Sequence, residues 1–230
     1  MQTSSTQPLV QVIDVHKEYV LGHRTVHALR GLTLEIQRGG FVVMQGPSGS
    51  GKTTLLNLIG CIDRPTAGRV LVSGQDTSTL PDNELSRFRA RKLGFVFQNF
   101  NLIPVLTAAE NIEYPLRILG MTAAEARSKA GAMLEEMGLR EEAAQRPAEL
   151  SGGQCQRVAI GRALVAQPEL VVADEPTANL DSKTGEMIIR VMHQMRDRLG
   201  TTFLISTHDP DVAAHAEQRW YLRDGGLATP

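Results

Sequence analysis

The sequence has few cysteines, no long apolar run and no excess of either charge, and each of these features narrows the possible functions. Its 230 residues include only Cys61 and Cys155, without a C-x-x-C pair, which suits reduced thiols in a cytosolic protein. No apolar run approaches the roughly 20 residues of a membrane-spanning helix, so action at a membrane would require another subunit that spans it. The formal net charge of −1 gives no polyelectrolyte signature and does not favour nucleic-acid binding.

What the sequence does contain is a glycine-rich loop with the pattern G-x-x-x-x-G-K-[S/T]. In this pattern, backbone N–H groups wrap the phosphates of a nucleotide. An apolar run at 41–44 precedes the loop and a helix-forming stretch at 54–59 follows it. The motif requires this context, because a helix N-terminus attracts anions. The loop predicts a nucleotide-phosphate site made of Gly46, Pro47, Ser48, Gly49, Ser50, Gly51, Lys52 and Thr53, with the adjoining Thr54.

Two adjacent acids, Asp174 and Glu175, directly follow an apolar run at 170–173. A strand-end acid beside a phosphate loop is well placed to hold Mg²⁺ together with the hydroxyl of Thr53. Glu175 would then act as general base, or orient water, for attack on the γ-phosphate, while Lys52 neutralises the developing charge. A solvated turn or helix cap would explain the acid pair equally well if the phosphate loop were absent.

The segment LSGGQ at 150–154 has two interpretations. Ser151 and Gln154 have the spacing of a capping box, which would simply begin a helix. Gly152 and Gly153 follow the cap directly and leave backbone N–H groups open to a ligand anion, which indicates a binding function. Taken alone, these residues support both interpretations about equally.

Apolar runs of strand length alternate with helical segments, which argues for an α/β fold with a largely parallel sheet. Strands expected at 9–15 and 28–36 suggest an additional antiparallel portion. From 99 to 147 the pattern is helical: capping boxes begin at Thr107 and Thr122, and Pro115 should kink or split the first helix. We therefore predict a helical subdomain at 99–147, inserted between core segments 1–98 and 148–230.

Taken together, the ordered motifs resemble those of the ATP-binding cassette (ABC) ATPases. The matching pieces are GPSGSGKT at 46–53, Gln98, LSGGQ at 150–154, LVVADEP at 170–176, NLD at 179–181 and TH at 207–208. Longer stretches at 26–36, 46–76, 92–104 and 151–182 look like the macrolide-exporter (MacB) and lipoprotein-release (LolD) ATPases. The resemblance implies a RecA-like P-loop core, an antiparallel β subdomain, an inserted α-helical subdomain, and ATP with Mg²⁺ as cofactors.

The resemblance also implies roles for single residues. Tyr19 would stack on adenine, with a strand or core tyrosine as the local alternative. Gln98 would sense Mg²⁺ and the attacking water and couple the site to a membrane partner. His208 would contact the γ-phosphate, and Asp181 would lie across a dimer interface while also capping its own helix.

For partners, the resemblance implies that Ser151–Gln154 faces the phosphate loop of a second copy, so that two ATP molecules lie in a head-to-tail dimer. The dimer would drive a separate transmembrane permease from the cytoplasmic face of the inner membrane, with a periplasmic adaptor reached through that permease. The apolar segment 99–106 would form a groove for a coupling helix of the permease. Phe95 and Phe97 are expected instead in a buried strand and its exit.

Three other functions compete with this one. A soluble ABC ATPase acting on DNA or ribosomes usually has a long coiled coil or two cassettes, and this sequence has neither. A phosphate-loop kinase should exclude water, whereas the acid pair and LSGGQ indicate that water is activated. An ATPase that regulates periplasmic enzymes through its permease, without transport, fits the sequence equally well, because substrate specificity would lie in the permease.

Overall fold

The computed structural model describes residues 7–228, so the first six residues of the predicted core segment 1–98 and the last two of 148–230 lie outside it. A six-stranded sheet has the order β10-β9-β3-β8-β7-β6, with all neighbours parallel except β10 and β9. Its central strands are apolar and buried, as expected for a sheet covered on both faces. The predicted α/β class is confirmed. The strands are β3 (Phe41–Gln45), β6 (Leu93–Val96), β7 (Leu170–Asp174), β8 (Thr202–Ser206), β9 (Gln218–Arg223) and β10 (Gly226–Ala228).

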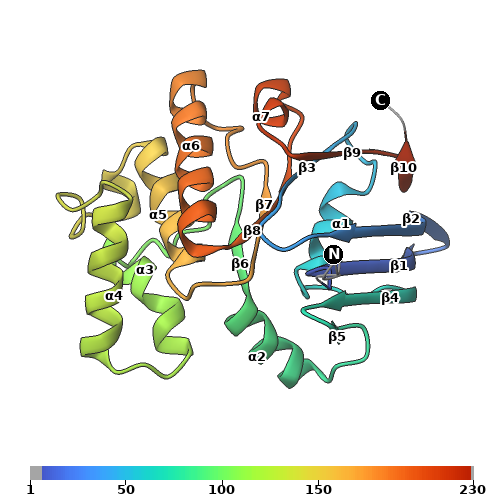
Figure 1. The fold of residues 1–230 in the computed structure, drawn as a ribbon, viewed down its shortest axis with the longest axis horizontal. Coiled ribbons are helices and arrows are strands. Elements are labelled where there is room, and N and C mark those ends of the chain that lie inside the picture. The colour runs from blue at the N-terminus through green and yellow to red at the C-terminus, as the bar shows by residue number, and fades with distance from the viewer. Residues whose placement is uncertain (1–6, 229–230) are drawn as a thin grey trace, which may run out of the picture.

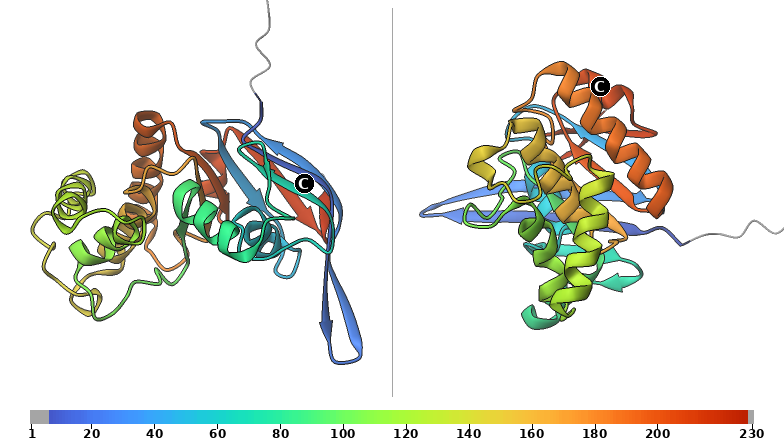
Figure 2. Two further views of the ribbon diagram at one scale, coloured as in Figure 1. Left: turned by 90° about the horizontal axis from the view of Figure 1, so that it is seen from below. Right: turned by 90° about the vertical axis from the view of Figure 1, so that its left-hand side faces the viewer.

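The predicted antiparallel portion is a separate four-stranded sheet of order β2-β1-β4-β5. Its strands are β1 (Val10–Leu21), β2 (Arg24–Ile36), β4 (Ala67–Val72) and β5 (Gln75–Asp76). The strands predicted at 9–15 and 28–36 were too short. Cross-strand pairing continues past residue 15, with Tyr19 opposite Val26, until the chain turns at Gly22. Figure 2 shows the resulting hairpin projecting from the body of the molecule.

Helix α1 (Lys52–Ile59) begins with the last two residues of the phosphate-loop motif and buries Leu55, Leu56, Leu58 and Ile59. Together with the antiparallel strands it contributes to one cluster of buried side chains. Three further helices belong to the predicted core segments, namely α2 (Asp82–Lys92), α6 (Ser182–Leu199) and α7 (Pro210–Ala214). Figure 1 shows the parallel sheet between the antiparallel sheet on one side and a group of helices on the other.

That group of helices contains α3 (Ala108–Ile118), α4 (Ala123–Glu136), the short 3-10 helix η1 (Pro147–Glu149) and α5 (Gly152–Leu164). The capping boxes predicted at Thr107 and Thr122 are both formed. The expectation that Pro115 splits the first helix was wrong, because α3 continues through it to Ile118. Only one turn follows the proline, and the Leu119 N–H closes that turn on the Pro115 carbonyl oxygen at 3.1 Å.

Helices α3, α4 and α5 share one cluster of buried side chains with strands of the parallel sheet. In particular, Ile112 and Met133 lie close to Gly161 of α5, where an added Cβ would approach them to 3.0 and 3.2 Å. The helical block is therefore packed onto the core without a break. The boundaries 1–98, 99–147 and 148–230 accordingly stay a prediction, since they follow chain order rather than a gap in packing.

Candidate functional site

The phosphate loop connects β3 to α1 and is bent by glycines that no other residue could replace. Gly46 has φ 148°, and a Cβ there would lie 2.1 Å from the Leu222 carbonyl oxygen. Gly51 precedes α1 with φ 104°, and a Cβ there would lie 2.6 Å from the Ala28 carbonyl oxygen. In the described residues no side chain caps α1, so the N–H groups of its first turn are open to an anion.

Within this loop, the polar groups of Lys52 and Thr53 are both held by hydrogen bonds. The Lys52 Nζ donates to the carbonyl oxygens of Gly46 at 2.7 Å and Pro47 at 3.0 Å, which keeps the cation inside the loop. The Thr53 Oγ1 donates to Asp174 Oδ2 at 3.2 Å, and the Ser206 hydroxyl donates to the other oxygen of Asp174. The phosphate loop and the end of β7 therefore meet, as the sequence predicted.

The hydroxyl of Thr53 and the carboxylate of Asp174 fit a magnesium ion, which prefers hard oxygen ligands. No group of three or more histidine, cysteine, aspartate or glutamate side chains within residues 7–228 could hold a metal by itself. Mg²⁺ is usually held by one or two protein ligands together with substrate phosphates. Gln98, the third predicted ligand, is exposed and lines the same cavity as Thr53 and Asp174.

The second predicted acid, Glu175, is joined to His208. The His208 Nδ1 lies 2.9 Å from Glu175 Oε1, and the His208 backbone N–H donates to Glu175 Oε2 at 3.4 Å. The hydrogen bond and the negative charge of Glu175 raise the pKa of the His208 imidazole. Glu175 itself has φ 47°, an uncommon backbone conformation for a non-glycine residue, and its side chain is only 16% exposed. The pair is therefore held in one place.

These groups surround one open cavity of about 520 Å³, which we call the central cavity. Its lining comes from β2, the phosphate loop, α1, and the segments after β6, β7 and β8. Those residues are Val26, His27, Ala28, Ser48, Gly49, Gly51, Lys52, Thr53, Thr54, Gln98, Asp174, Glu175 and His208. Gly46, Pro47 and Ser50 shape the loop without lining the cavity. The sequence analysis missed Val26, His27 and Ala28, which nothing in their pattern distinguishes from ordinary strand residues.

Tyr19 is not among the residues that line the central cavity. Its hydroxyl donates to Asp63 Oδ2 at 3.0 Å, and the Lys17 Nζ lies 4.9 Å from the centre of its ring. Partial burial raises the pKa of the Tyr19 phenol. The cross-strand partner of Tyr19, Val26, does line the cavity, so the ring lies next to the site rather than in it. Stacking of Tyr19 on adenine stays a prediction.

The segment Ser151–Gln154 lies elsewhere, in a second hollow of about 270 Å³ that shares no lining residue with the central cavity. The capping box is formed: the Ser151 Oγ accepts from the Gln154 N–H at 3.3 Å, and Gln154 Oε1 accepts from the Ser151 N–H at 2.7 Å. Ser151 and Gly152 are exposed, so the N-terminus of α5 faces outward. The structure thus confirms the capping interpretation and leaves the surface free for a ligand.

Asp181 lines the same hollow and caps α6, accepting from the Thr184 N–H at 3.1 Å. Its predicted capping role is therefore confirmed. Just before it, the Asn179 Nδ2 donates to the Gln98 carbonyl oxygen at 2.9 Å and to Asn99 Oδ1 at 3.2 Å. The sequence analysis gave Asn179 no structural role, because its partner is 81 residues away in the chain.

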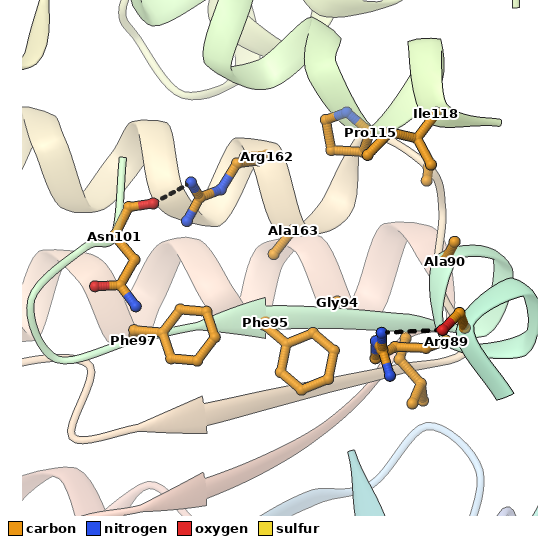
Figure 3. A pocket seen from close by; sticks show the side chains of 13 residues that line it. Arg89, Ala90, Gly94, Phe95, Phe97, Asn101, Pro115, Ile118, Arg162 and Ala163 are labelled. Atoms are coloured by element: carbon orange, nitrogen blue, oxygen red, sulfur yellow. Dashed lines mark hydrogen bonds between the residues drawn. The ribbon is translucent and has the colours of Figure 1, made fainter. Parts of the chain in front are cut away.

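A third feature is an apolar groove of about 430 Å³ between α2, β6, α3 and α5, part of which is drawn in Figure 3. The rings of Phe95 and Phe97 lie stacked in its floor with centres 5.9 Å apart, and both are half-buried. Phe95 belongs to the buried strand β6 and Phe97 directly follows it, as predicted, although both rings keep part of their surface exposed. The lining residues are Ser86, Arg89, Ala90, Leu93, Gly94, Phe95, Phe97, Asn101, Pro115, Ile118, Arg162, Ala163 and Ala166. Of the predicted segment 99–106, only Asn101 lines this groove.

Comparison with known proteins gives a family match and close relatives. Residues 29–178 match the model of a family described as ABC transporter. The chain is 48% identical over 219 residues to the macrolide export ATP-binding/permease protein MacB of Syntrophobacter fumaroxidans, covering 94% of this chain and 31% of that protein. It is 46% identical to an ABC transporter ATP-binding protein of Thermotoga maritima, covering 95% of this chain and 93% of that protein. The chain thus spans about a third of the length of the MacB relative.

Among solved structures, the chain resembles a dimeric post-hydrolysis state of the ATP-binding cassette MJ0796, bound to ADP and Pi, with TM-score 0.89 and 45% identity. The match covers 96% of this chain and 97% of that one. The MJ0796 protein of Methanocaldococcus jannaschii is itself 46% identical over 221 residues. Within residues 7–228, no helix has both the length and the apolar character needed to cross a membrane.

Proposed function

The chain belongs to the ABC transporter family, and from this premise we propose that it is an ATPase that drives a separate transmembrane permease. The proposal rests on the central cavity, where four segments that are far apart in the chain come together. They supply Lys52 and Thr53, Gln98, the acids Asp174 and Glu175, and His208.

In this proposal the phosphate loop binds the β- and γ-phosphates through its backbone N–H groups and Lys52. Thr53 and Asp174 hold Mg²⁺, which supplies charge neutralisation on the phosphate oxygens. Glu175 accepts the proton of the attacking water, and Gln98, on the segment after β6, contacts the same water. His208, held by Glu175 at 2.9 Å and more readily protonated than usual, donates to the γ-phosphate.

The active site is completed by a second copy of the chain. Ser151–Gln154 and Asp181 lie together in a hollow separate from the central cavity, so one chain does not surround a γ-phosphate with them. In a two-fold dimer, the open N-terminus of α5 of each chain would lie over the phosphate loop of the other chain, which gives two equivalent sites. The dimeric structure of MJ0796 bound to ADP and Pi supports association of two copies.

The permease is proposed to bind at the apolar groove beside Gln98. The stacked rings of Phe95 and Phe97 offer apolar surface of the kind that receives an amphipathic helix. The MacB relatives are named ATP-binding/permease proteins, and this chain spans about a third of their length. The chain would then act at the cytoplasmic face of the inner membrane through its permease, with a periplasmic adaptor beyond it, either for transport or for transmission of force.

The test is Mg²⁺-dependent ATP hydrolysis by the purified chain, compared with Glu175→Gln. This substitution keeps the shape of the side chain and removes the base, so turnover should fall roughly 10²- to 10⁴-fold while ATP still binds. With hydrolysis blocked, Glu175→Gln should elute as a dimer when ATP is present and as a monomer without it.

The matched control is Glu135→Gln, an exposed carboxylate on α4 whose one ion pair within residues 7–228 is with Arg140 at 3.2 Å. It should hydrolyse ATP at the wild-type rate. Near-normal turnover in Glu175→Gln would remove Glu175 as the base. Absence of Mg²⁺-dependent hydrolysis in the wild-type chain would refute the proposed function.

A further inference from the structure

The chain takes an unusual backbone conformation two residues after Gln98. Phe100 and Asn101 are consecutive non-glycine residues with φ 59° and 47°. This left-handed region is costly for a side chain with a Cβ, most of all for a bulky one such as phenylalanine. Such a pair persists only where surrounding contacts hold it. The local backbone hydrogen bonds use the two N–H groups, Phe100 to the Phe97 carbonyl and Asn101 to the Asn99 carbonyl, and leave both carbonyl groups of the pair for another donor.

Arg162 of α5 is that donor. Its Nη2 donates to the Phe100 carbonyl oxygen at 2.8 Å, and its Nη1 donates to the Asn101 carbonyl oxygen at 2.5 Å. Figure 3 shows the second of these bonds, between Asn101 on the loop after β6 and Arg162 on α5. A guanidinium presents two parallel N–H groups in a fixed fork, which matches two carbonyls that the left-handed turn aims the same way. A lysine ammonium has three donors but lacks this rigid planar fork.

The Arg162 side chain is half-buried, and within residues 7–228 no carboxylate lies within 4.0 Å of its charge. Burial lowers the pKa of the guanidinium. Burying a cation without a counter-ion is unfavourable unless its donors are satisfied by hydrogen bonds. The two carbonyl groups therefore hold the Arg162 side chain, and Arg162 in turn fixes the position of these carbonyl groups.

The contact between Arg162 and the segment 100–101 links Gln98 to α5, and both take part in the proposed active site. Ser151 caps the N-terminus of α5 and Arg162 lies in its last turn, so Arg162 connects the segment 100–101 to the helix whose other end would face the second copy. Asn179, two residues before Asp181, donates to the carbonyl oxygen of Gln98, which shortly precedes this segment. Arg162 and Asn101 also line the apolar groove proposed for the permease.

We propose that Arg162 is a positioning residue that sets the place of Gln98 by clamping the left-handed pair Phe100–Asn101 to α5. The proposal rests on the proposed function of the central cavity, but the clamp itself does not depend on nucleotide. A helix bound in the groove would press on the clamp and move Gln98 and the Ser151 end of α5 together. Arg162 does not line the central cavity and acts on Gln98 through the backbone.

The first test measures amide hydrogen exchange across residues 98–102 in nucleotide-free protein. Arg162→Gln should exchange these amides at least tenfold faster than the wild-type chain, because the fork that holds the turn is lost. Arg162→Lys keeps the charge but loses the rigid fork, so its exchange should lie between the two. Unchanged exchange in Arg162→Gln overturns the inference, whatever the chain does with ATP.

The second test is kinetic. Arg162→Gln should lower kcat for ATP roughly 10- to 100-fold, because a small displacement of Gln98 misplaces the attacking water, and should leave KM within about twofold. Asn101→Gly added to Arg162→Gln should restore at least a third of the lost kcat, since glycine takes the left-handed conformation without a clamp. The matched control is Gln167→Gly, at φ 53° and just beyond the end of α5, which should restore nothing.

The outcomes separate the two proposals. A wild-type kcat in Arg162→Gln, or equal restoration by Asn101→Gly and Gln167→Gly, overturns the role of the clamp. A chain that hydrolyses no ATP overturns the proposed function, and the exchange measurement still decides whether Arg162 holds the turn.

Discussion

Replacing Glu169 by glutamine removes a carboxylate on which three distant segments converge. Glu169 precedes β7, the strand that ends in Asp174. Its Oε2 accepts from Arg38 Nη1 at 2.6 Å and from the Ser73 Oγ at 2.6 Å, and its Oε1 accepts from the Lys92 Nζ. Arg38 comes from the turn before β3, Ser73 from the end of β4, and Lys92 from the end of α2. The cluster therefore ties the antiparallel sheet and α2 to the parallel sheet.

The pKa of Glu169 gives the size of the expected effect. Burial alone would raise this pKa, but the hydrogen bonds from Lys92, Ser73 and Arg38 outweigh it and lower the pKa from 4.5 to about 2. Such a difference between the unfolded and folded states is equivalent to about 3 kcal/mol of stability at neutral pH. The side chain is 28% exposed, so solvent screening reduces the figure to roughly 2 kcal/mol.

The sign follows from a depressed carboxyl pKa. The stabilisation is fully present above pH 4.5 and is lost as the pH falls toward 2. In urea denaturation at pH 7, Glu169→Gln should unfold with about 2 kcal/mol less free energy than the wild-type chain. At about pH 3.5 the difference should shrink by roughly 40%. The control Glu135→Gln should stay within about 0.5 kcal/mol of wild type at both pH values. A Glu169→Gln difference near zero, or one that does not change with pH, would refute the reasoning.

Two substitutions test the predicted ligand contacts. If Tyr19 stacks on adenine, Tyr19→Ala should weaken ATP binding roughly tenfold, whereas Tyr19→Phe, which loses only the bond to Asp63, should bind normally in a titration. Equal affinity in all three chains would return Tyr19 to a strand residue that holds Asp63. Ser151→Arg should abolish hydrolysis in the dimer while ATP binding by the monomer stays within about twofold, because Ser151 does not line the central cavity of its own chain. A large loss of monomer binding would contradict that separation.

Much of the site was predictable because local sequence determines it. The phosphate loop needs glycines at fixed positions, and Gly46 and Gly51 show why, since neither position has room for a Cβ. The capping boxes at Thr107, Thr122 and Ser151 are likewise short-range arrangements and form as predicted. Where the acids follow a buried strand, parallel pairing of β7 with its neighbours carries them to the phosphate loop.

What the sequence did not reveal depends on contacts between distant residues. The pair Glu175–His208 joins positions 33 apart, and the clamp joins Arg162 to carbonyl groups about 60 residues earlier. Backbone carbonyls accept hydrogen bonds regardless of side chain, so no residue pattern marks them as the partners of an arginine. The length of β1 was underestimated for a related reason, because pairing with β2 extends the strand through Lys17 and Glu18, which read as a polar break.

The central claim is that the active site is shared between two copies, and a mixing experiment tests it most directly. Lys52→Ala removes the phosphate-loop cation and leaves Ser151 intact, whereas Ser151→Arg does the reverse. Each variant alone should hydrolyse no ATP. An equal mixture should recover about a quarter of wild-type activity, because about half of the dimers are mixed and each of these has one site with both parts intact. Activity that stays at zero across all mixing ratios, with mixed dimers present, would contradict the shared site.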